Sequence, residues 1–181
     1  MALKATIFKA DLSISDMDRN YYNDHSLTIA RHPSENDERM MMRLLAFALH
    51  ADEALVFGNK IGNEDEPDLW LRDPTGVIDL WIDVGQPEEK LVRRACGRSR
   101  QVVIYCFSGH GADVWWRQNT SGFEKLKNLT VISLPASAAP ALAGMATRSM
   151  ELQFTIQDGQ VWVSDGKNTV HIDLKTFTRA C

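Results

Sequence analysis

The sequence has few cysteines, no long apolar run and no strong excess of charge. Its three cysteines, Cys96, Cys106 and Cys181, form no CxxC spacing, so neither a disulfide framework nor a zinc knuckle is predicted. No apolar stretch approaches the roughly 20 residues that a membrane-spanning helix needs. The N-terminus also lacks the apolar core of a signal peptide. We therefore expect a cytoplasmic protein with no membrane partner.

The charge balance narrows the ways in which this chain can bind nucleic acid. The net charge is −4 and the sequence pI is about 5.7. Because a general nucleic-acid coat is normally basic, any such contact must come from a local patch. The histidines are scattered without HxH or HExxH spacing, which argues against a zinc site: His25, His32, His50, His110 and His171.

The predicted elements indicate an α/β (α+β) fold. In order, they are strands at 5–15 and 22–30, a helix at 34–50, a hairpin at 67–84, a helix at 87–98, a strand at 101–107, a helix at 109–118, a strand at 129–134, a helix at 136–147, and strands at 151–157, 161–164 and 169–174. We expect a single domain over residues 1–181. A mixed central sheet flanked by helices would carry antiparallel strand additions at both termini.

The hairpin at 67–84 places two carboxylates on one face. Successive side chains of a strand alternate between faces, so Asp68 and Trp70 share a face on the first strand, as do Trp81 and Asp83 on the second. A turn centred on residues 74–75 puts Asp68 opposite Trp81 and diagonal to Asp83. A register slip of two residues would instead make the aspartates direct neighbours, and their shared face survives either register.

Two interpretations of this face remain open. Carboxylates this close repel unless a proton or a cation lies between them, and oxygen ligands suit Mg²⁺ or Mn²⁺. Alternatively, Asp68 and Asp83 are solvated residues on an exposed hairpin face, where Arg72 pairs with Asp79. The bare hairpin favours this second interpretation.

A basic helix follows the hairpin directly. Lys90, Arg93, Arg94 and Arg98 lie within 87–98, beside the acidic pair. Phosphodiester chemistry uses this combination, because a metal activates water and cations hold phosphate. The simpler interpretation is that basic residues late in a helix complement its dipole and that Glu89 pairs with Arg93.

Three stretches resemble the YaeQ family, a bacterial group whose fold is similar to the PD-(D/E)XK nucleases. They are His32-Pro-Ser-Glu-Asn-Asp-Glu-Arg-Met, Glu66-Pro-Asp-Leu-Trp, and Asp79-Leu-Trp-Ile-Asp-Val-Gly-Gln-Pro with the following Lys90 and Ala95-Cys-Gly-Arg. The likeness extends over nearly the whole chain.

The resemblance implies roles for individual residues. Pro67-Asp68 matches the first part of the nuclease motif and Asp83 matches its second acidic position, so these two aspartates would hold Mg²⁺ or Mn²⁺. The motif lysine should stand at position 85, where this chain has glycine. Gln86 or Lys90 would then contact water or phosphate instead.

The first helix supplies the last implied site residue. Glu38, or Glu35 close by, would add a carboxylate to the metal site. The resemblance thus implies a nuclease-like, metal-dependent phosphodiesterase that acts on nucleic acid. The alternative is a catalytically inactive nucleic-acid-binding or protein-binding regulatory protein on the same fold, and the missing lysine favours it.

Other motifs point less specifically to function. Residues 108–111 follow a buried strand and resemble a phosphate-binding turn, but they lack the P-loop lysine. The tryptophans at 70, 81, 115 and 116 are of the kind that stack on bases, although large aromatics more often pack a core.

Overall fold

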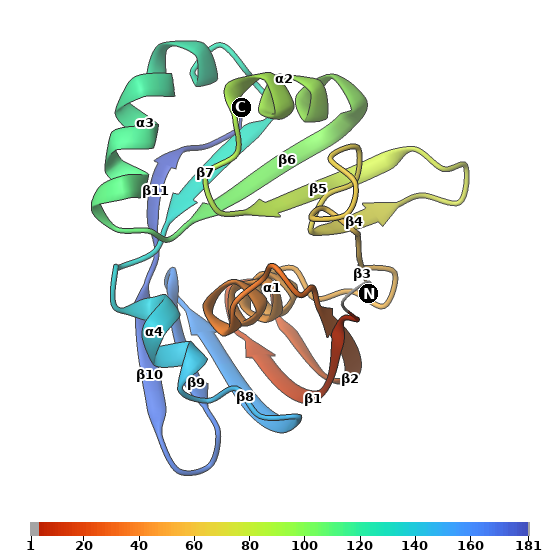
Figure 1. Cartoon of the computed structure of the whole chain (residues 1–181), viewed down its shortest axis with the longest axis vertical. Coiled ribbons are helices and arrows are strands. Elements are labelled where there is room, and N and C mark those ends of the chain that lie inside the picture. The colour runs from red at the N-terminus through yellow and green to blue at the C-terminus, as the bar shows by residue number, and fades with distance from the viewer. Residues whose placement is uncertain (1–3, 181) are drawn as a thin grey trace. The chain divides into compact units, whose positions relative to one another are not determined.

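The computed structural model of the chain describes residues 4–180, which contain four helices and eleven strands. These residues form two compact units, each with its own mixed sheet (Figure 1). Within the described part, unit 1 comprises residues 4–49 and 137–174, and unit 2 comprises residues 50–136 and 175–180. The predicted mixed α/β class is confirmed. The single nuclease-like domain at 1–181 stays a prediction.

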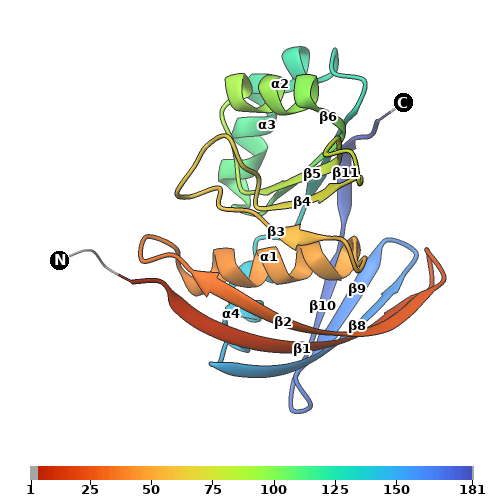
Figure 2. The ribbon, with the colours of Figure 1, turned by 90° about the vertical axis from the view of Figure 1, so that its right-hand side faces the viewer.

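Unit 1 is a five-stranded sheet with a helix against one face. Its strands are β1 (Thr6–Asp16), β2 (Tyr21–Arg31), β8 (Ser149–Gln157), β9 (Gln160–Ser164) and β10 (Thr169–Asp173), in the spatial order β10-β9-β8-β1-β2, and its helices are α1 (Asp37–Leu49) and α4 (Ala138–Ala143). Figure 2 shows the strands curving around α1. Alternate residues of β1, from Phe8 to Ile14, are buried on the helix side, and the residues between them are exposed.

The strands from the two ends of the chain join in this one sheet, and their pairing differs from the antiparallel arrangement expected. β1 and β8 run parallel, with Lys9 opposite Ser149 and Asp16 opposite Ile156. The strands next to each other in sequence, β1–β2, β8–β9 and β9–β10, pair antiparallel as predicted. A short turn fixes the direction of a neighbouring strand, whereas no local signal fixes the direction of a strand more than a hundred residues away.

Unit 2 is a six-stranded sheet with two helices packed on the same core. Its strands are β3 (Val56–Phe57), β4 (Leu69–Arg72), β5 (Ile78–Val84), β6 (Ser99–Cys106), β7 (Leu129–Ser133) and β11 (Lys175–Thr178), in the order β11-β7-β6-β5-β4-β3, and its helices are α2 (Glu89–Arg98) and α3 (His110–Phe123). The parallel strands β5, β6 and β7 are connected through these helices. Val92 of α2 and Phe123 of α3 lie in one core with Trp81, Val102 and Ile104 of the sheet.

Several predicted boundaries change in the structure. The helix expected at 109–118 extends to Phe123, whereas the one expected at 136–147 is confined to Ala138–Ala143. The short edge strands β3 and β11 were not predicted, because two to four residues are too few for a recognisable alternation. None of the described helices is long and apolar enough to cross a bilayer.

Of the two described cysteines, Cys106 is buried and Cys96 is partly buried. Desolvation raises the pKa of Cys96 and of Cys106 to about 11 in each case. Cys106 is fully buried in the core.

We predict that these thiols react slowly in the folded protein. At pH 8 about one in a thousand of each is a thiolate, because their pKa lies about three units above the pH. Alkylation with iodoacetamide, read by peptide mass spectrometry, should modify Cys96 and Cys106 far more slowly in buffer than in urea. Equal rates in the two conditions would contradict the burial.

Candidate functional site

The hairpin of β4 and β5 brings Asp68 and Asp83 side by side. Leu69 pairs with Ile82 and Trp70 with Trp81, so continuing this register by one residue places Asp68 across from Asp83. The diagonal placement expected from a tight turn is wrong. The register shifts between Leu71 and Arg72, and the slip makes the aspartates direct neighbours. Asp68 and Asp83 do lie on the same face of the hairpin, as strand alternation predicted.

Both carboxylates are buried. Asp68 is 2% exposed and Asp83 is 3% exposed, so the interpretation as solvated surface residues is wrong. Oδ2 of Asp68 accepts a hydrogen bond from the N–H of Val84 at 2.9 Å, and Oδ1 of Asp83 accepts one from the N–H of Asp68 at 3.3 Å. Oδ2 of Asp83 accepts a third from the indole N–H of Trp81 at 2.9 Å. The first two bonds connect the start of β4 to the end of β5, and the third lies within β5.

The cation beside this pair is Lys60, which the sequence analysis missed. Its Nζ lies 3.4 Å from Oδ2 of Asp83, and its side chain is only 14% exposed. Lys60 belongs to the loop between β3 and β4, so it precedes both aspartates in sequence. No periodic pattern covers this loop, and only its closeness to Pro67-Asp68 could have drawn attention to it.

Aromatic rings and guanidinium groups surround the ion pair. The rings of Trp70 and Trp81 meet edge to face with centroids 6.2 Å apart. The guanidinium of Arg98 lies over Trp81, 5.3 Å from the ring centroid, and that of Arg72 lies over Trp70 at 4.2 Å. The carboxylate of Asp79 pairs with Arg100 at 2.5 Å, and not with Arg72 as was expected.

A second contact ties the Lys60 loop to α2. Asp65 accepts a hydrogen bond from Arg94 at its carboxylate and one from Arg98 at its backbone carbonyl, the latter at 3.0 Å. The loop is thus held at one point by the Lys60–Asp83 ion pair and at another by two arginines of the helix.

The backbone conformation at position 85, where the nuclease motif has its lysine, favours glycine. Gly85 has a φ of +107°, a region that side chains rarely adopt, and its N–H donates to the carbonyl of Tyr105 at 2.8 Å. A lysine there would strain the backbone. The end of β5 therefore cannot carry the motif lysine at its usual place without a different main-chain path.

Gln86 and Lys90, the two residues expected to replace that lysine, lie in different surroundings. Oε1 of Gln86 accepts a hydrogen bond from the hydroxyl of Ser108 at 3.3 Å, so Gln86 links the ends of β5 and β6. Lys90 is exposed near the start of α2, and within residues 4–180 it makes no ion pair. Lys60 pairs with Asp83, whereas neither Gln86 nor Lys90 forms a hydrogen bond or ion pair with the two aspartates.

The carboxylates expected from the first helix belong to unit 1. Glu38 lies in the first turn of α1 and is partly exposed. Glu35 is buried, and its carboxylate accepts hydrogen bonds from Arg39 at 2.8 Å and from Nε of Arg43 at 2.9 Å. Glu35 is therefore neutralised inside unit 1, while Asp68 and Asp83 lie in unit 2.

The donor set at the aspartate pair does not fit a divalent metal as the side chains lie. Both oxygens of Asp83 already accept from protein N–H groups, and the ammonium of Lys60 lies at its Oδ2. Mg²⁺ requires six oxygen ligands close to octahedral geometry. Among the described residues no cluster of three or more acidic, histidine or cysteine side chains is placed to bind a metal.

Comparison with known proteins identifies the family. The family model described as YaeQ protein matches residues 1–174. The chain belongs to the YaeQ family. Proteins named YaeQ from Escherichia coli K12 and Salmonella typhi are each 45% identical to it over 177 residues, covering 98% of both chains.

Two solved structures share this fold. The YaeQ protein from Xanthomonas axonopodis pv. citri has a TM-score of 0.94 and 48% identity, with 98% of this chain and 99% of that chain covered. The YaeQ protein from Pseudomonas syringae has a TM-score of 0.92 and 32% identity, with 96% of each chain covered. The resemblance noted in the sequence is confirmed at the level of the family.

We predict that Lys60 stabilises the fold through Asp83. Lys60→Met keeps the apolar stem but leaves a buried carboxylate without its cation, and this should lower the free energy of unfolding by about 2–4 kcal/mol. In urea denaturation, Asp83→Asn should recover part of that loss in the double variant. Lys125→Met, at an exposed lysine after α3, is the matched control and should change little. Strictly additive losses from Lys60 and Asp83 would contradict the ion pair.

Gly85 offers a second test, because an added Cβ there meets nothing within 4 Å. Any loss from Gly85→Ala therefore reports backbone conformation alone, and we expect about 1–3 kcal/mol of destabilisation. Gly97 of α2 is equally open to a Cβ but helical, so Gly97→Ala should stabilise by up to about 1 kcal/mol. Thermal unfolding of both variants checks the contrast, and similar shifts in Tm would argue against the strained glycine.

Proposed function

We propose that this protein binds nucleic acid through the basic face of α2, defined as Lys90, Arg93, Arg94 and Arg98, and that it does not cleave what it binds. The observation that carries the proposal is that α2 buries only Val92 and Ala95 and turns its cations to solvent.

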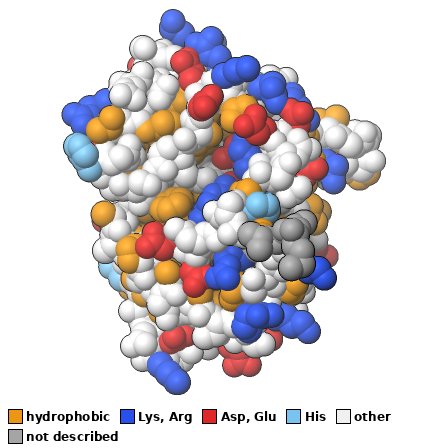
Figure 3. All heavy atoms as spheres, in the orientation of Figure 1, with side chains coloured by type: hydrophobic (Ala, Val, Ile, Leu, Met, Phe, Trp, Pro, Cys, Tyr) orange, Lys and Arg blue, Asp and Glu red, His pale blue; other side chains and the backbone are white. Residues whose placement is uncertain are grey.

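The exposure of this face supports phosphate binding. The side chain of Arg93 is 59% exposed and that of Arg94 is 43% exposed. Figure 3 shows Lys and Arg side chains gathered along the upper edge of the view, in the region of α2. Arg93 pairs with Glu89 and Arg94 with Asp65, yet a guanidinium has five donors and can hold a carboxylate and a phosphate together.

We also infer a PD-(D/E)XK nuclease-like core in unit 2. Pro67-Asp68 leads into β4, Asp83 stands near the end of β5, and α2 and β6 follow. In a nuclease, carboxylates at the positions of Asp68 and Asp83 would hold a metal. In this chain Asp83 pairs with Lys60, and both aspartates accept hydrogen bonds from backbone N–H groups. On this fold the acidic pair thus serves to fix the loop of Lys60 and Asp65 against the hairpin and α2.

The charge balance of unit 2 determines how strongly we expect it to bind nucleic acid. Unit 2 carries twelve Lys and Arg residues against thirteen Asp and Glu residues, so long-range attraction to a polyanion is absent. Binding should be weak, local and lost as salt rises.

We predict salt-dependent binding of short labelled DNA or RNA by fluorescence anisotropy. The logarithm of the binding constant should fall with the logarithm of the salt concentration with a slope of about −2 to −4, as for a few phosphate contacts. Lys90→Ala and Arg93→Ala should each weaken binding several-fold and reduce the slope by about one. Lys175→Ala on β11, an exposed cation outside α2, is the control.

The same samples test the rival activity. Incubation of single-stranded and double-stranded DNA and RNA with the protein and Mg²⁺ or Mn²⁺ should leave every substrate intact. Cleavage that Asp83→Asn abolishes would overturn the proposal in favour of a metal-dependent phosphodiesterase. Binding that Lys90→Ala and Arg93→Ala leave unchanged would overturn the assignment to α2.

A further inference from the structure

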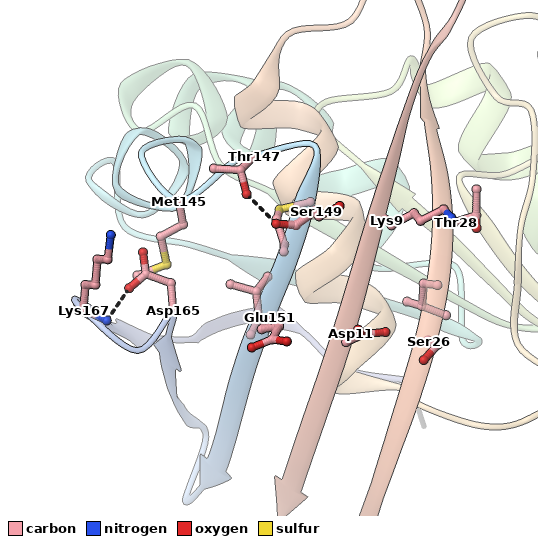
Figure 4. A pocket seen from close by; sticks show the side chains of 13 residues that line it. Lys9, Asp11, Ser26, Thr28, Met145, Thr147, Ser149, Glu151, Asp165 and Lys167 are labelled. Carbon is pink, nitrogen blue, oxygen red and sulfur yellow. Dashed lines mark hydrogen bonds between the residues drawn. The ribbon is translucent and has the colours of Figure 1, made fainter.

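The outer face of the unit 1 sheet, away from α1, carries a cavity of about 620 Å³ (Figure 4). A second cavity of about 440 Å³ adjoins it and shares Asp11, Ser26, Glu151 and Asp165 with it. Binding sites for ligands generally fall in this range of volume. The cavity lies in unit 1, whereas the basic face of α2 lies in unit 2, so the proposed function does not use it.

An open strand edge borders this cavity. The ladder between β8 and β9 ends where Gln153 pairs with Ser164. Residues 149–152 of β8 therefore have β1 on one side and, within residues 4–180, no strand on the other. The β9–β10 turn, with Asp165, bounds the gap at the end of β9.

The direction of the backbone groups follows from bonds already formed. The carbonyls of Arg148 and Ile156 accept hydrogen bonds from Lys9 and Met17, so even-numbered residues here face β1. Because successive residues of a strand direct their N–H and C=O groups to opposite edges, Ser149 and Glu151 face the gap. The Ser149 carbonyl is taken by the hydroxyl of Thr147 at 2.8 Å, which leaves its N–H and both groups of Glu151 facing the gap.

The charge beside this edge is negative. Asp11 stands opposite Glu151 in the parallel register, and among the described residues neither carboxylate has an ion-pair partner. Asp165 accepts N–H bonds from Asn168 and Lys167, which lower the pKa of its carboxyl. Lys9 and Lys167 are the cations at the cavity, against four acidic groups when Asp24 of the adjoining cavity is included.

We propose that this edge binds an extended, basic peptide segment of a partner protein. The segment adds to β8 in the line that β9 would take if it were four residues longer, and its Lys or Arg side chain lies against Asp11 and Glu151. Main-chain hydrogen bonds to Ser149 and Glu151 hold the strand, as in β-augmentation generally, and the carboxylates select the charge. Lys9 and Lys167 disfavour an acidic segment.

The test is fluorescence anisotropy of the full chain with short labelled peptides of alternating Val and Arg, with Val and Glu as the matched acidic peptide. We expect the basic peptide alone to bind. Glu151→Gln with Asp11→Asn should weaken it about tenfold or more. Lys167→Gln, which removes a competing cation, should tighten it.

A proline variant separates edge pairing from simple charge attraction. Ser149→Pro removes an N–H that faces the gap and leaves the charges and the β1 ladder in place, since proline is tolerated where the N–H lies outside the ladder. It should weaken the basic peptide about two- to tenfold with an unchanged Tm. Thr169→Pro, at the first residue of β10, is the corresponding control on another strand of the sheet and should leave the affinity unchanged.

Three results would overturn the proposal. Equal affinity for the acidic peptide would exclude charge selection. Saturation by free arginine at the affinity of the peptide, with no effect of Ser149→Pro, would make the cavity a site for a small cation. Self-association of the chain that Ser149→Pro abolishes would assign the edge to a second copy. DNA or RNA binding by the same variants should equal that of the wild type, so the outcome here is independent of the α2 proposal.

Discussion

A buried carboxylate is costly unless hydrogen bonds or an opposite charge compensate it, and in unit 2 Lys60 supplies that charge at Asp83. The pair stands at the end of the parallel strand β5, next to a second buried aspartate. For Lys60 to reach Asp83, the loop before β4 must fold back over the hairpin. The same loop carries Asp65, which accepts hydrogen bonds from Arg94 and Arg98 of α2.

Strand alternation was sufficient to predict which residues share the hairpin face. It was insufficient for register and burial, because a bulge before Arg72 sets the first and the packing of α2 and α3 on the sheet sets the second. Lys60 could not be identified from the sequence, since its position depends on a loop that returns across the sheet. Gly85 shows the reverse case: the departure from the nuclease motif was visible in the sequence, and its cause, a positive φ, became visible only in the backbone.

The division into two units could likewise be predicted only in part from the sequence. Each terminal strand pair was predictable from its own alternation and turn residues. The parallel pairing of β1 with β8 closes unit 1 from segments more than a hundred residues apart, and no local pattern encodes it. β9 is shorter than β8, which leaves residues 149–152 beside the cavity with an open edge. A surface with binding potential thus arises from topology, not from a sequence motif.

On the function proposed above, the cation at Asp83 is the ammonium of Lys60 and not a divalent ion. Isothermal titration of Mn²⁺ into the wild type and into Asp83→Asn tests it most directly. We expect no saturable binding to the wild type at millimolar Mn²⁺ and the same result for the variant, because Lys60, the N–H of Asp68 and the indole N–H of Trp81 already contact the Asp83 oxygens. Stoichiometric binding of Mn²⁺ to the wild type that Asp83→Asn removes would contradict it.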